Sequence, residues 1–290
     1  MSEQQEISKP IYKSNALVEA SYRLSPAEQR IMLSCITQVR RDQPITDDIL
    51  YSVSAADYAA LSGTESHSVY KELADAALRL KRREVWIKQE PNGRGKRTST
   101  LITGWVQSIL YVKSEGRVEL RFSKDMLPYL TQLTEQFTRY MLSDVAKLNS
   151  GYAIRLYELL CQWRDVGERE VSIEWLRDAF MLEGKYPAIK DFKKRVVEPA
   201  VEQVNEHTSL WVKWDQRKTG RRVSHFVFTF GEKNAKKTGR KAKTKKQPPS
   251  SDQHSVYGIP SEVIAKHARP GDSWEDAALR AFEARKAGQK

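Results

Sequence analysis

The residues Val53–Tyr58 (VSAADY) and Val171–Leu176 (VSIEWL) begin two segments of the chain that follow one plan. Each stretch predicts a short apolar strand whose serine caps a helix, because a serine side chain accepts a hydrogen bond from the first helical turn. A second, longer helix follows, and then a strand with a tryptophan, at Val85–Lys88 (VWIK) or Leu210–Lys213 (LWVK). The repeat is one of pattern, with few identical letters.

Each tryptophan strand runs into a basic turn, at 92–97 (NGRGKR) or 217–222 (RKTGRR), after which an apolar strand returns. Two helices followed by a hairpin are the order of a winged helix, whose second helix enters a DNA groove. We therefore predict an α+β chain of two tandem winged-helix domains, at 11–135 and 136–231. Each is a helix-turn-helix with a β-hairpin wing, and 232–290 is a basic flexible linker with a short helical tail.

The charge of the chain favours a polyanionic partner. The net charge is +12 and the isoelectric point is near 9.5, which is typical of proteins that bind nucleic acid. More than half of the excess lies in 232–246, which has eight Lys or Arg and one acidic residue. The case for DNA binding by the domains therefore depends on where their own charges fall.

Other features of the sequence exclude several classes of protein. No apolar run has the length of a membrane span, and Met1–Pro10 is polar, so we expect a cytoplasmic protein without membrane contact. Cys35 and Cys161 fall on apolar helix faces, where reduced core thiols are expected. The five histidines are scattered and Gly95-Lys96 lacks the upstream glycine of a phosphate loop, so we predict no catalytic site, metal or cofactor.

The densest candidate for DNA recognition is the predicted helix from about Ala188 to Glu206. At 100° per residue, Ile189, Phe192 and Val196 share the core face. The residues on or beside the opposite face are Lys190, Asp191, Lys193, Lys194 and Arg195. Arg and Lys pair with guanine and Asp accepts from cytosine, so we predict base contacts here; the alternative is a solvated charged face. Pro199 either kinks the helix or is a tolerated irregularity.

The basic turns and the first domain supply the remaining candidates. Four cations of the second turn suit phosphates or a narrow minor groove, and the alternative is a turn that is merely soluble. These are Arg217, Lys218, Arg221 and Arg222, and their counterparts in the first turn are Arg94, Lys96 and Arg97. The first recognition helix, predicted from about Glu65 to Arg82, offers only His67, Ser68 and Lys71, so we expect it to add phosphate affinity more than sequence choice.

The stretch Leu101–Val112 is predicted to be a strand that is apolar on both faces. One face carries Leu101, Trp105, Ile109 and Tyr111, and the other carries Ile102, Val106, Leu110 and Val112. Such a strand needs cover on both sides. The second cover is either the other domain or another copy of the protein.

Several separated motifs resemble the replication initiators of iteron plasmids, particularly those of the F plasmid type. They are Ser14–Ser25 (SNALVEASYRLS), Phe137–Tyr140 (FTRY), Tyr152–Arg164 (YAIRLYELLCQWR) and Asp191–Arg195 (DFKKR). The similarity runs in order from about Ile11 to Gly231. It implies two winged-helix domains, of which the second is the main reader of repeated origin sites in double-stranded DNA.

The resemblance also implies partners. Members of the family bind iterons as monomers to open the origin, and as dimers joined through the first domain they repress their own promoter. It therefore places Leu101, Trp105, Ile109 and Tyr111 at a dimer interface, and it makes the host initiator ATPase and replicative helicase expected partners. The tail after Lys233 departs from the shorter members. The rival interpretations are a purely regulatory repressor and an enzyme such as a nickase or primase.

Overall fold

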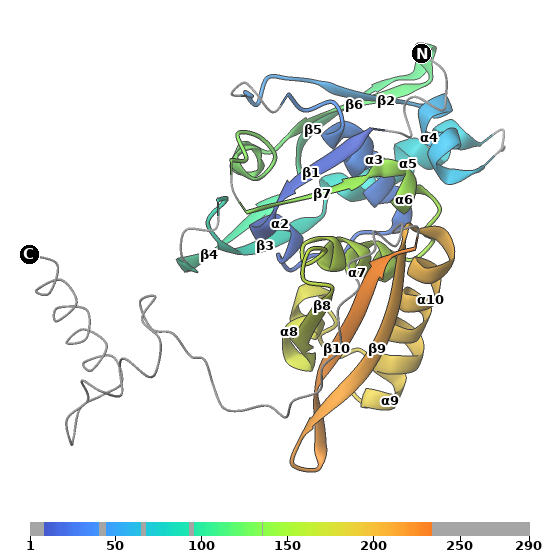
Figure 1. Ribbon diagram of the computed structural model, residues 1–290. Helices are drawn as coiled ribbons and strands as arrows, with labels where there is room; N and C mark the ends of the chain where they lie inside the picture. Colours follow the sequence, from blue (N-terminus) through green and yellow to red (C-terminus); the bar gives the residue numbers. More distant parts are fainter. Residues whose placement is uncertain (1–8, 41–44, 65–67, 93–95, 135, 234–290) are drawn as a thin grey trace, which may run out of the picture. The chain divides into compact units, whose positions relative to one another are not determined.

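The computed structural model describes residues 9–40, 45–64, 68–92, 96–134 and 136–233 (Figure 1). These residues fall in one compact unit, Met1–Lys236. The predicted linker begins too early, because Glu232 still pairs in the last strand of the second hairpin; residues 234–290 lie outside the described residues. Among the described residues, no helix is long and apolar enough to cross a membrane.

The first half of the chain contains a helical pair preceded and followed by strands. Its elements are β1 (Pro10–Ser14), α2 (Asn15–Val18), α3 (Pro26–Ile36), β2 (Tyr51–Ser54), α4 (Ala55–Ser62), α5 (Val69–Lys81), β3 (Glu84–Gln89), β4 (Lys96–Gly104), β5 (Val106–Val112), η1 (Lys113–Glu115), β6 (Arg117–Phe122) and η2 (Lys124–Tyr129). The helix-turn-helix pair is α4 and α5. Ser54 caps α4 and accepts from the Asp57 amide, as the sequence predicts.

The second half repeats this order. Its elements are β7 (Phe137–Met141), α6 (Leu142–Ala146), α7 (Gly151–Cys161), β8 (Glu168–Ser172), α8 (Ile173–Ala179), α9 (Ile189–Phe192), the π-helical η3 (Lys193–Val197), α10 (Glu198–His207), β9 (Leu210–Thr219) and β10 (Arg222–Glu232). Ser172 caps α8 through the Trp175 amide. The helix-turn-helix pair is α8 with the continuous run α9–η3–α10.

The two copies differ in how their sheets close. In the second domain the strand before the helix pair joins the hairpin, giving the antiparallel order β8-β10-β9. In the first domain the equivalent strand pairs with a later one, in the order β2-β6-β5, and β3-β4 form a separate hairpin. The first winged helix therefore contains an extra strand pair that the repeat pattern does not predict.

The prediction of one continuous strand over Leu101–Val112 was wrong. The segment is divided at Trp105, so that β4 pairs with β3 whereas β5 pairs with β6. Trp105 is fully buried in the core of its own chain and packs edge-to-face on Tyr22, with ring centroids 4.8 Å apart. The break lets the two halves of the segment pair in different sheets, with the Trp105 side chain buried at the point of division.

Polar side chains as well as strands join segments that lie far apart in the sequence. β1 pairs with β7. The carboxylate of Glu158, on α7, accepts from Lys13 Nζ at 2.6 Å, from Tyr22 OH at 3.1 Å and from Tyr140 OH. Arg155 donates from Nη1 to the Val18 carbonyl at 2.9 Å and from Nη2 to the Ala20 carbonyl at 2.7 Å. We call Lys13, Tyr22, Tyr140, Arg155 and Glu158 the junction cluster.

The charges of the junction cluster are balanced although its members are buried. Burial acts to raise the pKa of Glu158, but the cations Lys13 and Arg155 outweigh it and the pKa lies below its ordinary value. Close approach of the segment before α3 also fixes the residue at the start of α7. A Cβ on Gly151 would lie 2.4 Å from the Leu24 carbonyl oxygen, so only glycine fits there.

The two cysteines are core thiols, as the sequence predicts. Cys35 and Cys161 are free and buried. Burial raises the pKa of both thiols, that of Cys161 to about 12. Both groups are therefore protonated and unreactive at neutral pH.

Candidate nucleic-acid interface

The recognition helix of the second domain is held by its own core face. Phe192 and Val196 are buried, and the ring of Phe192 lies 5.8 Å from that of Phe226 on β10. Ile189 is partly buried against the same cluster. The predicted core face is therefore confirmed, and it fixes which residues point away from the domain.

The charged residues predicted to read DNA lie where the sequence places them. Lys190, Asp191, Lys194 and Arg195 are all exposed. Lys193 is half-buried, and its Nζ donates to Gln216 Oε1 on β9 at 3.2 Å. Lys193 therefore joins the helix to the wing, whereas the other four present a free charged surface at the helix start. Contact with bases stays a prediction.

Pro199 does not break this helix. Lys193–Val197 form a π-helical turn, in which the Glu198 amide donates to the Lys193 carbonyl five residues back. The wider turn relieves the clash between a proline ring and the carbonyl four residues earlier, the cause of most proline kinks. The helix therefore runs without interruption from Ile189 to His207.

Arg177 on α8 holds the turn that precedes the recognition helix. Its guanidinium donates from Nη1 to the Lys185 carbonyl at 2.9 Å and from Nη2 to the Tyr186 carbonyl at 2.5 Å. The same group lies 4.5 Å from the centre of the Phe192 ring. Arg177 thereby sets the position of the first turn of α9, although nothing in its sequence neighbourhood marks it.

The wing of the second domain is a long hairpin whose tip lies at the same end of the domain as α9 (Figure 1). Lys218, Arg221 and Arg222 are exposed, and none forms an ion pair with another described residue. Arg217 differs, because it pairs with Glu170 on β8 and its Nη2 lies 3.1 Å from His225 Nδ1. Three of the four predicted wing cations are therefore free to meet an anion.

The first domain offers a sparser surface. Ser68 and Lys71 are exposed at the start of α5. His67 and Arg94 lie outside the described residues, and for Lys96 and Arg97 only the backbone, in β4, is described. The prediction that these residues contact phosphates is therefore not tested.

The predicted dimer face is only partly at the surface. Tyr111 is 43 % exposed, and Leu101 and Ile109 are partly buried against the core. Trp105 has no exposed surface, so it cannot contact a second copy while this fold is kept. On the other face of the same segment, Ile102 and Leu110 are each about half exposed.

Among the described residues, no group of three or more His, Cys, Asp or Glu side chains could hold a metal ion. Exposed cations cluster instead at the start of the second recognition helix and on the β9–β10 hairpin. Together with the fold, these features define the class as a tandem winged-helix protein with a basic recognition surface.

Comparison with known proteins identifies the family. The sequence matches the family described as "Initiator Replication protein, WH1" over residues 10–161 and that described as "Initiator Rep protein, WH2" over residues 172–230. The chain belongs to this family of replication initiator proteins, and the resemblance to iteron-plasmid initiators is confirmed. The boundary that we predict between 135 and 136 is not tested by these spans.

Individual relatives have low sequence identity to this chain but align with most of its length. A replication initiation protein of Escherichia coli is 27 % identical over 230 residues, covering 75 % of this chain and 68 % of its own. An uncharacterised 27.6 kDa protein of Escherichia coli is 27 % identical over 233 residues, covering 77 % and 94 %. The crystal structure of the Pi initiator protein in complex with iteron DNA is 21 % identical, covers 79 % of this chain and 99 % of its own, and superposes with a TM-score of 0.65.

Proposed function

We propose that this protein initiates replication of a plasmid by binding directly repeated origin sequences as a monomer. Binding helps to open the origin and recruits host replication proteins, among them the initiator ATPase and the helicase. As a dimer the protein represses its own promoter. It performs no catalysis, so the DNA is melted by binding and bending alone.

The observation that carries this proposal is the exposed set Lys190, Asp191, Lys194 and Arg195 at the start of the second recognition helix. This end of a helix enters the major groove in helix-turn-helix proteins. The related Pi protein was crystallised with iteron DNA, which supports the same class of target for this chain. Two recognition helices in one chain suit a site that spans two grooves.

Footprinting the protein on DNA that flanks its own gene tests the proposal. Protection of several in-line repeats is the expected result, since an initiator loads several monomers side by side. Protection of a single palindrome and nothing else would favour the repressor. A transformation assay with a plasmid lacking any other initiator separates the two independently, because only an initiator supports its replication.

The absence of catalysis and the role of the tail need separate tests. Incubation with supercoiled origin DNA and magnesium is expected to leave the DNA uncut, whereas a nick would identify an enzyme. Deletion of the residues after Gly231 is expected to spare DNA binding and impair replication. Unchanged copy number would show that host factors do not depend on the tail.

Dimerisation is proposed through the first domain, on the surface that includes Tyr111, Leu101 and Ile109. Trp105 does not contribute to this surface, since it is buried within its own chain. Tyr111→Lys is expected to shift the chain towards monomer in analytical ultracentrifugation without weakening iteron binding. If the dimer persists unchanged, the interface lies elsewhere.

A further inference from the structure

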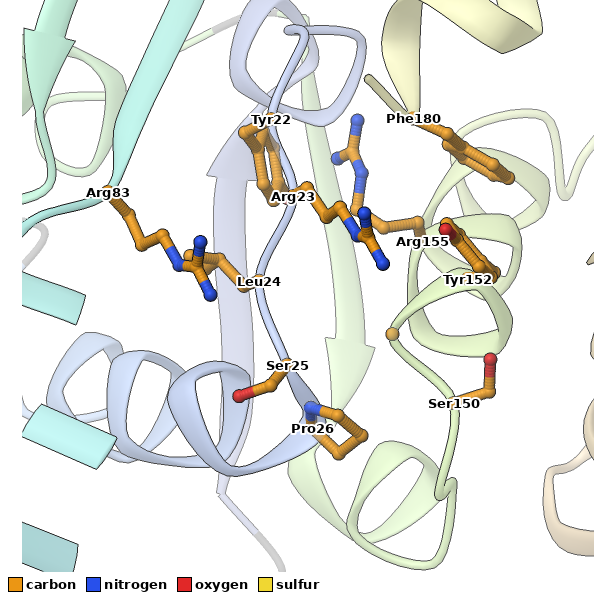
Figure 2. A pocket seen from close by; sticks show the side chains of 11 residues that line it. Tyr22, Arg23, Leu24, Ser25, Pro26, Arg83, Ser150, Tyr152, Arg155 and Phe180 are labelled. Carbon is orange, nitrogen blue, oxygen red and sulfur yellow. The ribbon is translucent and has the colours of Figure 1, made fainter. Parts of the chain in front are cut away.

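A pocket of about 470 Å³ lies between segments from the first and second halves of the chain. The segment before and at the start of α3 forms one wall, and the start of α7 forms another (Figure 2). The residues that line it are Tyr22, Arg23, Leu24, Ser25, Pro26, Arg83, Ser150, Gly151, Tyr152, Arg155 and Phe180. Three of these are arginines and none is acidic, so the lining favours an anion.

Arg23 is the cation most available to a ligand. It is exposed, forms no ion pair with another described residue, and lies 5.8 Å from the centre of the Tyr152 ring. Figure 2 shows its guanidinium directed towards Tyr152. Arg83 is bound to Glu28 at 3.0 Å, but Arg79 pairs with the same carboxylate at 3.4 Å. Two cations thus share one buried acid, and a positive surplus remains beside the pocket.

Unsatisfied polar atoms surround the same pocket. Arg155 is 1 % exposed, and its Nε has no hydrogen-bond partner, although the rest of its guanidinium is bound to backbone carbonyls. The buried hydroxyl of Tyr152 has no partner either. Both atoms belong to residues that line the pocket, and a buried donor without a partner costs about 1–3 kcal/mol.

Two further features narrow the chemistry of the ligand. The first residues of α3 and α7, each of 11 residues, line the pocket, and the dipoles of helix starts favour anions, while the Glu28 and Ala153 amides already donate to Ser25 and Ser150. Tyr152 and Phe180 stack on each other with centroids 5.6 Å apart, giving an aromatic wall beside the cations. Phosphate oxygens suit the first set of groups, and a planar ring suits the second.

The pocket is remote from the ends of the helices that we expect to read bases. Arg83 follows the end of α5, and Lys71 lies twelve residues earlier, roughly 18 Å away at 1.5 Å per residue. In the second domain, Gln203 of α10 accepts from the Ser150 amide, whereas Lys190 lies thirteen residues earlier, roughly 20 Å away. A small free ligand therefore fits this site better than the DNA that the helix starts address.

We propose that this pocket binds a small phosphate ester with an aromatic ring, of the class of a nucleoside monophosphate. The phosphate lies against Arg23 and the starts of α3 and α7, and the ring lies against Tyr152. Because segments far apart in the sequence contribute to the lining, an occupied pocket favours their described arrangement and links replication activity to the concentration of a small molecule.

Isothermal titration calorimetry of the full chain tests the proposal with three probes: adenosine 5′-monophosphate, adenosine and inorganic phosphate. The monophosphate is expected to bind with one site per chain and to raise the melting temperature, while each fragment binds more weakly. Arg23→Ala is expected to weaken binding of the monophosphate about tenfold or more, since a charge-assisted contact is lost. Arg23 is exposed, so this variant keeps the fold.

Arg139→Ala is the matched control, because Arg139 is also exposed and lies 5.9 Å from the centre of a tyrosine ring, that of Tyr12. Its binding of the monophosphate is expected to equal that of the unaltered chain. No binding at millimolar concentrations, equal loss in both variants, or adenosine binding as tightly as its phosphate would each overturn the proposal. So would loss of DNA affinity in Arg23→Ala without any monophosphate binding, since the pocket would then serve the DNA backbone.

Discussion

Arg195 and Lys194 present their charges from the helix start that addresses the major groove. A bidentate contact to guanine discriminates against the wrong base by about 1–3 kcal/mol. We therefore expect Arg195→Ala, or Lys194→Ala, to weaken binding to the natural repeats by this amount and to relax sequence choice. Fluorescence anisotropy on specific and random duplexes checks both effects; equal loss on the two duplexes would show contact with phosphate alone.

We expect Arg177 to affect DNA binding indirectly, because it fixes the turn before α9 by donating to the Lys185 and Tyr186 carbonyls. Arg177→Ala is expected to loosen this turn, so that amide hydrogen exchange accelerates at 185–192 and sequence-specific affinity falls several-fold. Arg177→Lys is the control, because lysine keeps the charge but lacks the planar fork that reaches two carbonyls. If the lysine variant behaves as the unaltered chain does, charge and not positioning is the role of this residue.

At the scale of elements, the wing and the recognition helix should contribute different terms to DNA binding. Lys218, Arg221 and Arg222 are exposed on the hairpin without acidic partners among the described residues. Each phosphate contact contributes about 0.9 to the slope of log affinity against log salt. Arg221→Ala and Arg222→Ala are each expected to reduce this slope by about one and to weaken specific and random DNA alike.

Lys213→Ala is the control for the wing, since Lys213 is an exposed cation near the start of β9 rather than at the hairpin end. Its salt slope is expected to stay unchanged. A change in base preference in the Arg221 or Arg222 variants would contradict a pure phosphate role and would place that side chain in the minor groove.

The elements themselves divide into those that the sequence predicts and those that depend on tertiary packing. The caps at Ser54 and Ser172 and the core face of the second recognition helix follow from local chemistry, and they are confirmed. The division of the strand at Trp105 depends on which sheet each half joins, which is a long-range choice. Local rules leave the effect of Pro199 open between a kink and a tolerated irregularity, and the π-helical turn before it accounts for the second outcome.

At the scale of the molecule, the sequence predicts the two domains but not the long-range contacts that hold the start of the chain to α7. Lys13 and Glu158 are separated by 145 residues, and each reads as an ordinary surface charge in its own segment. The roles of Arg177 and Arg155 cannot be predicted from the sequence either, because both donate to backbone carbonyls, which every residue type has. Gly151 does reflect the close approach of the chain at Leu24, but its role can be recognised only from the three-dimensional structure.

The junction cluster makes the stability of the whole molecule depend on one carboxylate. Glu158 is 1 % exposed, and Lys13 and Arg155 are buried beside it, so Glu158→Gln leaves two buried cations without a counter-charge. Breaking a buried pair in this way typically costs about 3–5 kcal/mol. We expect this loss in the free energy of unfolding, measured by urea denaturation at neutral pH. Glu170→Gln, which removes a partly exposed carboxylate paired with Arg217, should cost about 1 kcal/mol or less.

The stabilisation that Glu158 provides should depend on pH. Because the pKa of Glu158 is lowered on folding, its contribution to stability is complete above the ordinary glutamate value of 4.5 and is lost as the pH falls through the lower folded value. The difference in unfolding free energy between the unaltered chain and Glu158→Gln should therefore be constant from pH 6 to 7 and shrink below about pH 4.5. A difference that stays constant to lower pH would show that Glu158 acts through shape and hydrogen bonds rather than through its charge.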